Sequence, residues 1–251
     1  MNISMSGKTV FVTGAASGLG RATALEFARA GAFVGLMDLD AAGLQDTRAQ
    51  VEELGARCIT HAADVSRKAN CEAAIAAAIG AFGKLDVLCN VAGIVGFYHA
   101  TEVSEAAWEK CLAVNLSGPF YLCQAAIPHL LKSSGNIVNV ASAAALKGQA
   151  FTVPYATSKA ALVNMTRSLA MEFMHKPIRI NAVLPGAMNT AMAHSVRMPE
   201  DIDMSLCQRY FNMRPASDPA DVARFIVYVA SDQSLSLHGA CLSIDTGASA
   251  G

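Results

Sequence analysis

The chain has 251 residues, enough for one large α/β core, and hydrophobic residues make up 53% of it against 16% charged ones. So few charges predict that part of the surface is buried against partner subunits. The net charge of -1 gives no electrostatic footprint for nucleic acid or an anionic membrane surface. Residues 111–131 carry no formal charge, but their Asn, Gln, His and Pro side chains favour a buried or subunit-interface helix over a lipid-facing one.

Cysteine and histidine are scattered along the chain. Seven cysteines, an odd number without a Cys-x-x-Cys pair, predict reduced thiols and a cytoplasmic location rather than a disulfide framework. Six histidines without clustering predict no metal site. Met1 to Lys8 leads straight into an apolar strand, so no secretory signal is expected.

Short apolar runs alternate with helical patterns from one end of the chain to the other. Strands are predicted at Lys8–Thr13, Phe33–Asp38, Arg57–His61, Leu85–Cys89, Asn136–Val140, Ile178–Val183 and Ala240–Ile244. Helices are predicted at Arg21–Arg29, Ala41–Leu54, Lys68–Phe82, Glu105–Val114, Leu116–Lys132, Tyr155–Met174 and Ala220–Ala230. This alternation indicates one doubly wound, Rossmann-type α/β domain over residues 1–251, with a parallel sheet of about seven strands covered on both faces. Ligands are then expected beyond the carboxyl ends of the strands.

The first strand ends in a glycine-rich turn, TGAASGLG, at residues 13–20. Glycines there let the backbone approach a pyrophosphate, and the next helix directs its first N–H groups at the charge. The spacing differs from the commoner Gly-x-Gly-x-x-Gly, and a tight turn alone would also use glycine, but the place between strand and helix favours dinucleotide binding. The predicted cofactor contacts are Gly14, Ser17, Gly18, Leu19 and Gly20.

Asp38 ends the second strand, about 20 residues after the glycine-rich turn. A carboxylate at this place accepts hydrogen bonds from the adenosine ribose and repels the 2′-phosphate of NADP, so NAD is the predicted cofactor. Asp38 could instead cap the helix that starts at Ala41, although Asp40 is better placed to do so.

Further polar residues follow the later strands. Asp64-Val65 and Asn90-Val91-Ala92-Gly93 are ordinary turns when read alone. Together with TGAASGLG, Asp38, Asn115, Ser142, Tyr155-Ala-Thr-Ser-Lys159 and Pro185-Gly186, they make the chain resemble the short-chain dehydrogenase/reductase family over essentially its whole length. The resemblance implies further cofactor contacts at Asp64, Val65, Asn90, Ala92, Gly93, Tyr155, Lys159, Pro185, Gly186 and Thr190. Two departures are Val91, where a second Asn is frequent, and Asp245-Thr246-Gly247, where Asp-Gly-Gly is common.

Tyr155 and Lys159 are the expected centre of the chemistry. A tyrosine has a pKa near 10, too high for a base at neutral pH, but Lys159 lies one helical turn away. One positive charge at roughly 4–5 Å is worth roughly 3–4 kcal/mol, which predicts a phenolate near pH 7–8. Ser142 ends the fifth strand and can hydrogen-bond the reacting oxygen. In the family pattern Ser142, Tyr155 and Lys159 are catalytic, and Asn115 positions a water that links Lys159 to solvent.

Residues 187–215 form the segment that covers the substrate in this family. It contains the apolar residues Met188, Met192, Met198, Met204, Leu206, Tyr210, Phe211 and Met213. These side chains suit an adaptable apolar pocket or simply pack the segment onto the domain. Other expected walls are Val95, Phe97, Tyr98, Leu146 and Phe151, and the cations Lys147, Arg197 and Arg214 remain possible anion contacts.

The sequence therefore predicts an NAD-dependent oxidoreductase that interconverts an apolar secondary alcohol and its ketone. The alternatives are a 3-oxoacyl-thioester reductase, usually NADPH-linked and so disfavoured by Asp38, and a non-enzymatic relative, disfavoured by the complete set of catalytic residues. Two long helical segments with few charges, Leu116–Leu131 and Ala156–Phe173, predict a dimer contact through their outer faces. The resemblance implies a homotetramer, with residues 239–251 as the candidate second interface.

Overall fold

The computed structural model describes residues 3–190, 192, 197–208 and 214–250. Seven strands form one parallel sheet in the order β3-β2-β1-β4-β5-β6-β7, which confirms the predicted doubly wound Rossmann-type fold. The strands are β1 (Thr9–Thr13), β2 (Phe33–Asp38), β3 (Cys58–Ala62), β4 (Val87–Asn90), β5 (Asn136–Val140), β6 (Arg179–Pro185) and β7 (Cys241–Ile244). The order reverses between β1 and β4, so their carboxyl ends diverge into a crevice.

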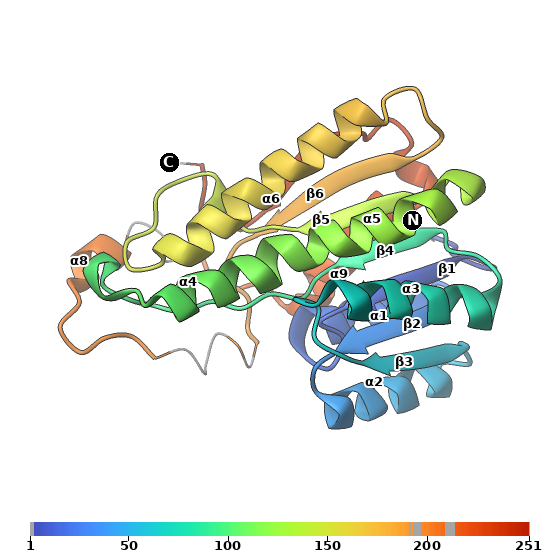
Figure 1. Cartoon of the computed structure of the whole chain (residues 1–251), viewed down its shortest axis with the longest axis horizontal. Coiled ribbons are helices and arrows are strands. Elements are labelled where there is room, and N and C mark those ends of the chain that lie inside the picture. The colour runs from blue at the N-terminus through green and yellow to red at the C-terminus, as the bar shows by residue number, and fades with distance from the viewer. Residues whose placement is uncertain (1–2, 191, 193–196, 209–213, 251) are drawn as a thin grey trace.

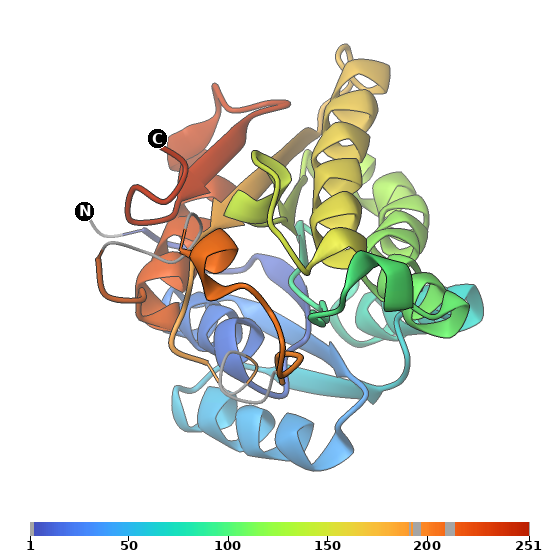
Figure 2. The same ribbon diagram turned by 90° about the vertical axis from the view of Figure 1, so that its left-hand side faces the viewer.

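Helices cover both faces of the sheet (Figures 1 and 2). They are α1 (Gly18–Arg29), α2 (Ala41–Glu53), α3 (Lys68–Phe82), α4 (Glu105–Leu112), α5 (Gly118–Ser133), α6 (Val153–Glu172), α8 (Met204–Cys207) and α9 (Pro219–Ala230). Short 3₁₀ turns occur at Ala100–Glu102, Ala143–Ala145 and Asp232–Ser234. One core cluster packs α1, α2 and α9 against the sheet, and a second packs α3, α5 and the end of α6 against the other face.

A π-helix joins the two helices that the sequence predicts on either side of Asn115. Residues Ala113–Ser117 form one wide turn that joins α4 to α5, so the two predicted helices are parts of one long, nearly continuous rod. Asn115 lies at its centre and is fully buried. In the part of the chain that the structure describes, no helix is long and apolar enough to cross a membrane.

The C-terminal turn has Thr246 where glycine is common in the family, yet its backbone keeps a conformation that favours glycine. Thr246 has a φ of 53°, the left-handed region that suits the glycine common at this place. The Asp245 carboxylate accepts hydrogen bonds from the backbone N–H groups of Gly247 at 3.1 Å and Ser249 at 3.0 Å. These bonds hold the turn in a shape that is costly for a β-branched residue.

Candidate active site

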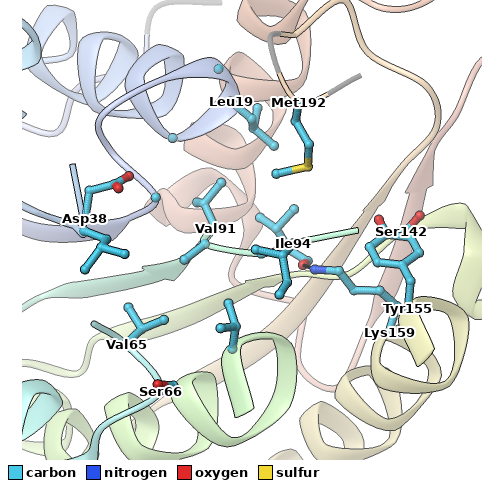
Figure 3. Close-up of a pocket in the computed structure, with 18 of the residues that line it drawn as sticks. Leu19, Asp38, Val65, Ser66, Val91, Ile94, Ser142, Tyr155, Lys159 and Met192 are labelled. Carbon is cyan, nitrogen blue, oxygen red and sulfur yellow. Dashed lines mark hydrogen bonds between the residues drawn. The ribbon is translucent and has the colours of Figure 1, made fainter. Parts of the chain in front are cut away.

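A cavity of about 800 Å³ opens at the carboxyl ends of the strands. Asp38 lies at one end, Ser142, Tyr155 and Lys159 lie at the other, and Val91 and Ile94 lie between them (Figure 3). The predicted residues that line the cavity are Gly14, Ser17, Gly18, Leu19, Gly20, Asp38, Asp64, Val65, Ala92, Gly93, Ser142, Tyr155, Lys159, Pro185, Gly186 and Thr190. Asn90 and Asn115 do not line it.

The glycine-rich turn brings three backbone segments close together. A side chain at Gly14, whose φ is +68°, would place its Cβ 2.9 Å from the backbone N and Cα of Ala92, and a Cβ at Gly20 would lie 2.0 Å from Gly14 O. Thr13 Oγ1 accepts hydrogen bonds from the N–H groups of Val91 at 3.0 Å and Ala92 at 3.1 Å. The ends of β1 and β4 are therefore tied together beside the cavity. Sequence reasoning did not assign this role to Thr13.

The first turn of α1 faces this cavity. Ser17 precedes the helix in an extended conformation, and its side chain makes no capping hydrogen bond. The first N–H groups of α1 are thus left for a ligand, and Gly18, Leu19 and Gly20 line the cavity. The turn fits the pyrophosphate of a dinucleotide because it combines closely packed glycine backbone with N–H groups that no side chain of the turn caps.

The Asp38 carboxylate is held in place by the backbone. Its Oδ2 accepts from Ala16 N at 3.0 Å and its Oδ1 from Asp40 N at 3.0 Å. Asp40, and not Asp38, caps α2, because its Oδ1 accepts from Ala42 N and Gly43 N at 3.1 Å each. The nearby Arg21 guanidinium is engaged by Ala16 O, Gly43 O and Thr47 Oγ1.

Asp64 stabilises its own turn and also lines the cavity. Its Oδ1 accepts from Ser66 N at 2.8 Å, and this hydrogen bond lowers the carboxyl pKa, with Arg67 and Lys110 acting in the same direction. Arg67, Glu109 and Lys110 line the same end of the cavity and were not predicted. No local pattern could have identified them, because tertiary packing decides how the start of α3, which Arg67 precedes, and the side of α4 with Glu109 and Lys110 meet the cavity.

Asn90 does not lie where the sequence analysis expected it. Its side chain alternates to the same face of β4 as Leu88, away from the cavity, and is 1% exposed. Nδ2 donates to Asn139 Oδ1 at 2.8 Å, and Asn139 Nδ2 donates to Thr166 Oγ1 at 2.9 Å. Asn90 therefore links β4, β5 and α6 inside the core.

Ser142, Tyr155 and Lys159 converge as predicted from their places at the strand ends. The Ser142 and Tyr155 side chains lie next to each other at this end of the cavity (Figure 3). Lys159 is 4% exposed and donates from Nζ to Val140 O at 2.8 Å. Its Nζ lies 5.9 Å from the centre of the Tyr155 ring.

The pKa of Tyr155 differs from the sequence-based expectation. Burial raises it above the usual 10, and the Ser142 hydrogen bond offsets this only in part. Burial also lowers the pKa of Lys159, to about 8, and the Lys159 ammonium donates to Val140 O. The low dielectric that strengthens a charge pair also penalises each charge, and here the penalty prevails. The expected phenolate near pH 7–8 therefore needs a further positive charge in the cavity.

The expected substrate walls are only partly correct. Met188, Met192 and Ile94 line the cavity, whereas Val95, Phe97, Tyr98, Leu146 and Phe151 are not among the lining residues. Met198, Met204 and Leu206 are exposed, and Tyr210, Phe211 and Met213 lie outside the described residues. Lys147 donates to Ala248 O, and neither it nor Arg197 nor Arg214 lines the cavity.

The family of the chain is shown by its similarity to known proteins. A family model described as enoyl-(acyl carrier protein) reductase matches residues 14–249. The 2,5-dichloro-2,5-cyclohexadiene-1,4-diol dehydrogenase LinX of Sphingobium indicum is 36% identical, with 98% of each chain covered. The chain belongs to the short-chain dehydrogenase/reductase family, and it is therefore an oxidoreductase of that family.

Two solved structures are similar in both sequence and fold. One is a 3-ketoacyl-(acyl-carrier-protein) reductase from Brucella melitensis complexed with NADH, with 30% identity, a TM-score of 0.89, and 98% of this chain and 100% of that chain covered. The other is a short chain dehydrogenase from Burkholderia cenocepacia in complex with NADP, with 32% identity, a TM-score of 0.88, and 97% and 98% covered. Proteins similar to this chain thus bind either nicotinamide cofactor.

Proposed function

We propose that this protein is an NAD-dependent dehydrogenase that interconverts an apolar secondary alcohol and the corresponding ketone. The observation that carries the proposal is one cavity with Asp38 at one end and the side chains of Ser142, Tyr155 and Lys159 together at the other. When bound, the nicotinamide takes the hydride from the alcohol carbon or returns it. The chain supplies the proton and holds the reacting oxygen.

In the oxidative direction the deprotonated Tyr155 oxygen takes the hydroxyl proton of the substrate alcohol as the C–H bond breaks, and a C=O bond forms. Ser142 hydrogen-bonds the same oxygen, and the Lys159 ammonium stabilises negative charge on the tyrosine. In the reductive direction Tyr155 returns this proton to the carbonyl oxygen. Because burial raises the Tyr155 pKa, the phenol is protonated near neutral pH and suits reduction, whereas oxidation should quicken as the pH rises.

The proposed cofactor contacts are the residues that line the dinucleotide side of the cavity. The α1 N-terminus receives the pyrophosphate, Asp38 accepts from the adenosine ribose, and Pro185, Gly186 and Thr190 approach the nicotinamide. Thr190 lies over the glycine-rich turn, with Cγ2 3.5 Å from where a Gly18 Cβ would be. NAD is favoured over NADP because the Asp38 carboxylate is fixed by two backbone N–H groups and Arg21 is engaged by the fold.

An apolar substrate is favoured by the side chains Ile94, Met188 and Met192 in the cavity wall. Residues 187–215 are proposed to cover the substrate within the single domain. LinX, whose name describes a cyclic diol substrate, makes a cyclic secondary alcohol a reasonable first test. The second candidate, a 3-oxoacyl-thioester reductase, is supported by the Brucella reductase, whose complex with NADH shows that such an activity need not exclude this cofactor.

A homotetramer in the cytoplasm is proposed for the assembled enzyme. The outer side of α5 leaves Phe120 exposed, and the end of α6 leaves Met171 exposed by 68%, apolar surface that a twofold-related copy could bury. All seven cysteines are free thiols, which suits a reducing compartment.

The test is a panel of cyclic and open-chain secondary alcohols, their ketones and a 3-oxoacyl thioester. Each compound is assayed with NAD and with NADP, and turnover is measured as the formation or loss of the reduced nicotinamide. Tyr155→Phe should lower kcat by at least about a hundredfold, while NAD binding stays nearly unchanged. Turnover above about a tenth of wild type would remove Tyr155 from this role. Faster turnover of the thioester than of any alcohol would favour the second candidate.

A further inference from the structure

Ser158 is a buried hydroxyl directly behind the reactive side chains. It is fully buried, precedes Lys159 on α6, and does not line the cavity. Its Oγ donates to the backbone carbonyl of Tyr155 at 2.7 Å and accepts from Asn115 Nδ2 at 3.0 Å. A serine needs only the first of these bonds to be satisfied inside a helix, so the second calls for an explanation.

Asn115 uses its whole amide to join separate parts of the chain. Its Oδ1 accepts from Ile94 N at 2.8 Å, and its Nδ2 donates to Ile94 O at 2.9 Å and to Ser158 Oγ. Ile94 lines the cavity, whereas Asn115 does not. The amide therefore fixes the loop after β4 on one side and α6 on the other.

The π-helix makes this arrangement possible. Its wide turn at Ala113–Ser117 lets Asn115 point across to both the Ile94 loop and α6. A Cβ at Gly93 would lie 3.3 Å from both Asn115 Oδ1 and Lys159 Nζ. The Gly93–Ile94 loop, the π-helix and the start of α6 are thus held at fixed separation, and the link from the π-helix to α6 includes the Ser158 hydroxyl.

We propose that Ser158 is a positioning residue for the reaction. Its hydroxyl holds Asn115 and, through it, the Ile94 backbone in register with Tyr155 and Lys159. The inference rests on the proposed function, because that function assigns the proton chemistry to Tyr155 and Lys159. Ser158 itself touches neither substrate nor cofactor.

Cys111 provides a weaker second acceptor for the same amide. Asn115 Nδ2 lies 3.4 Å from Cys111 Sγ, and this thiol lies 3.8 Å from Ser158 Oγ. A thiol is a poor hydrogen-bond acceptor, so it cannot replace the hydroxyl. A serine in place of Cys111 would offer the amide a good acceptor from its own helix.

Thr166 is a matched control on the same helix. Like Ser158 it is fully buried, donates from its hydroxyl to a helix carbonyl (Leu162 O, 2.8 Å), and accepts from an asparagine amide (Asn139 Nδ2, 2.9 Å). It lies two turns further from the cavity. Ser158→Ala and Thr166→Val each remove one such hydroxyl with little change in volume.

The first readout needs neither cofactor nor substrate. Hydrogen exchange of the peptide containing Ile94 should quicken in Ser158→Ala, because the amide that holds the Ile94 N–H has lost one of its anchors. It should be unchanged in Thr166→Val. Equal protection of Ile94 in wild type and Ser158→Ala would overturn the proposal.

The second readout is the separation of turnover from binding. With the best alcohol of the panel, kcat should fall by about 10-fold to 100-fold in Ser158→Ala, with NAD Kd changed less than about threefold. Thr166→Val should keep turnover near wild type. The double variant Cys111→Ser/Ser158→Ala should regain part of the loss, and Ser158→Cys, which keeps a weak donor and acceptor, should be intermediate and serves if the alanine variant does not fold.

The outcomes distinguish this proposal from the proposed function. Equal turnover in the Ser158 and Thr166 variants, with Tyr155→Phe inactive, refutes the positioning role and leaves the dehydrogenase intact. A wild-type protein that turns over no alcohol or ketone refutes the function, whereas the Ile94 exchange result still decides whether Ser158 anchors the loop.

Discussion

Replacing Lys159 by methionine should stabilise the folded protein at neutral pH while abolishing catalysis. Burial lowers the pKa of Lys159 from its usual 10.5 to about 8, and Val140 O is the partner of its ammonium. Keeping the proton below pH 8 therefore costs the folded state free energy, because the unfolded chain binds the same proton more tightly. A methionine has a similar length and carries no charge.

The magnitude follows from the pKa difference. A tenfold change in a proton equilibrium is worth about 1.4 kcal/mol, so the charged lysine costs about 3 kcal/mol at pH 7. Losing the hydrogen bond to Val140 O returns about 1 kcal/mol of this, which leaves Lys159→Met more stable by about 2 kcal/mol. Above pH 8 the folded state has released this proton, and removing it from the unfolded chain becomes easier as the pH approaches 10.5, so the advantage of Lys159→Met should shrink by about 2 kcal/mol by pH 9.5.

Urea unfolding at pH 7 and pH 9.5, at one protein concentration and followed by far-UV circular dichroism, measures both numbers. Lys176→Met, at an exposed lysine, should change neither value. A Lys159→Met protein that is less stable than wild type at pH 7, with a difference that does not vary with pH, would refute the reasoning. The ammonium would then be well accommodated in the fold, and the pKa of Lys159 would be the same in the folded and unfolded states.

Three further expectations concern the cofactor and the assembly. Wild type should bind NAD at least about tenfold tighter than NADP, and Asp38→Asn should narrow the gap in parallel titrations; a preference for NADP would contradict the role of Asp38. Gly14→Ala should lose about 2–3 kcal/mol of stability and most NAD affinity, because Gly14 has a positive φ and a Cβ there would lie 2.9 Å from the Ala92 backbone. The control variant Gly55→Ala should lose only about 1 kcal/mol, because Gly55 has a φ of +79° but nothing within 4 Å of its Cβ position. Sedimentation at micromolar concentration should give a tetramer; a dimer would keep the α5–α6 contact only, and a monomer would exclude it.

The sequence predicted the sheet and most of the cavity because both depend on local signals. A β-branched run that ends in glycine or a polar residue marks the carboxyl end of a strand, and parallel strands bring all such ends to one edge. Asp38 and Ser142 were found in this way, whereas Pro185 was implied by the family resemblance. The inward direction of the Asn90 side chain was not predicted, because one residue at a strand end decides which face its side chain takes, and the alternation shows this only when the bounds of β4 are known.

Other features depend on packing that no local pattern carries. The pKa of Tyr155 is raised by burial of the phenol, and spacing along a helix does not contain this fact. The cavity contacts of Arg67 and Lys110 arise where α3 and α4 meet the sheet. Asn115 and Ser158 are far apart in the sequence, and only the π-helix brings the amide to the hydroxyl.

The π-helix also gives the long α4–α5 rod one residue more than regular winding needs. A π-turn accommodates this extra residue in a single wide turn, so the helices on either side keep the register of one continuous α-helix. Leu122, Cys123 and Leu130 of α5 therefore stay in the core, while polar Gln124 stays exposed. Removing one residue from Ala113–Ser117 would restore regular winding and leave this packing in place, but it would turn the Asn115 amide away from its partners. A deletion that the core tolerates would thus be felt at the active site.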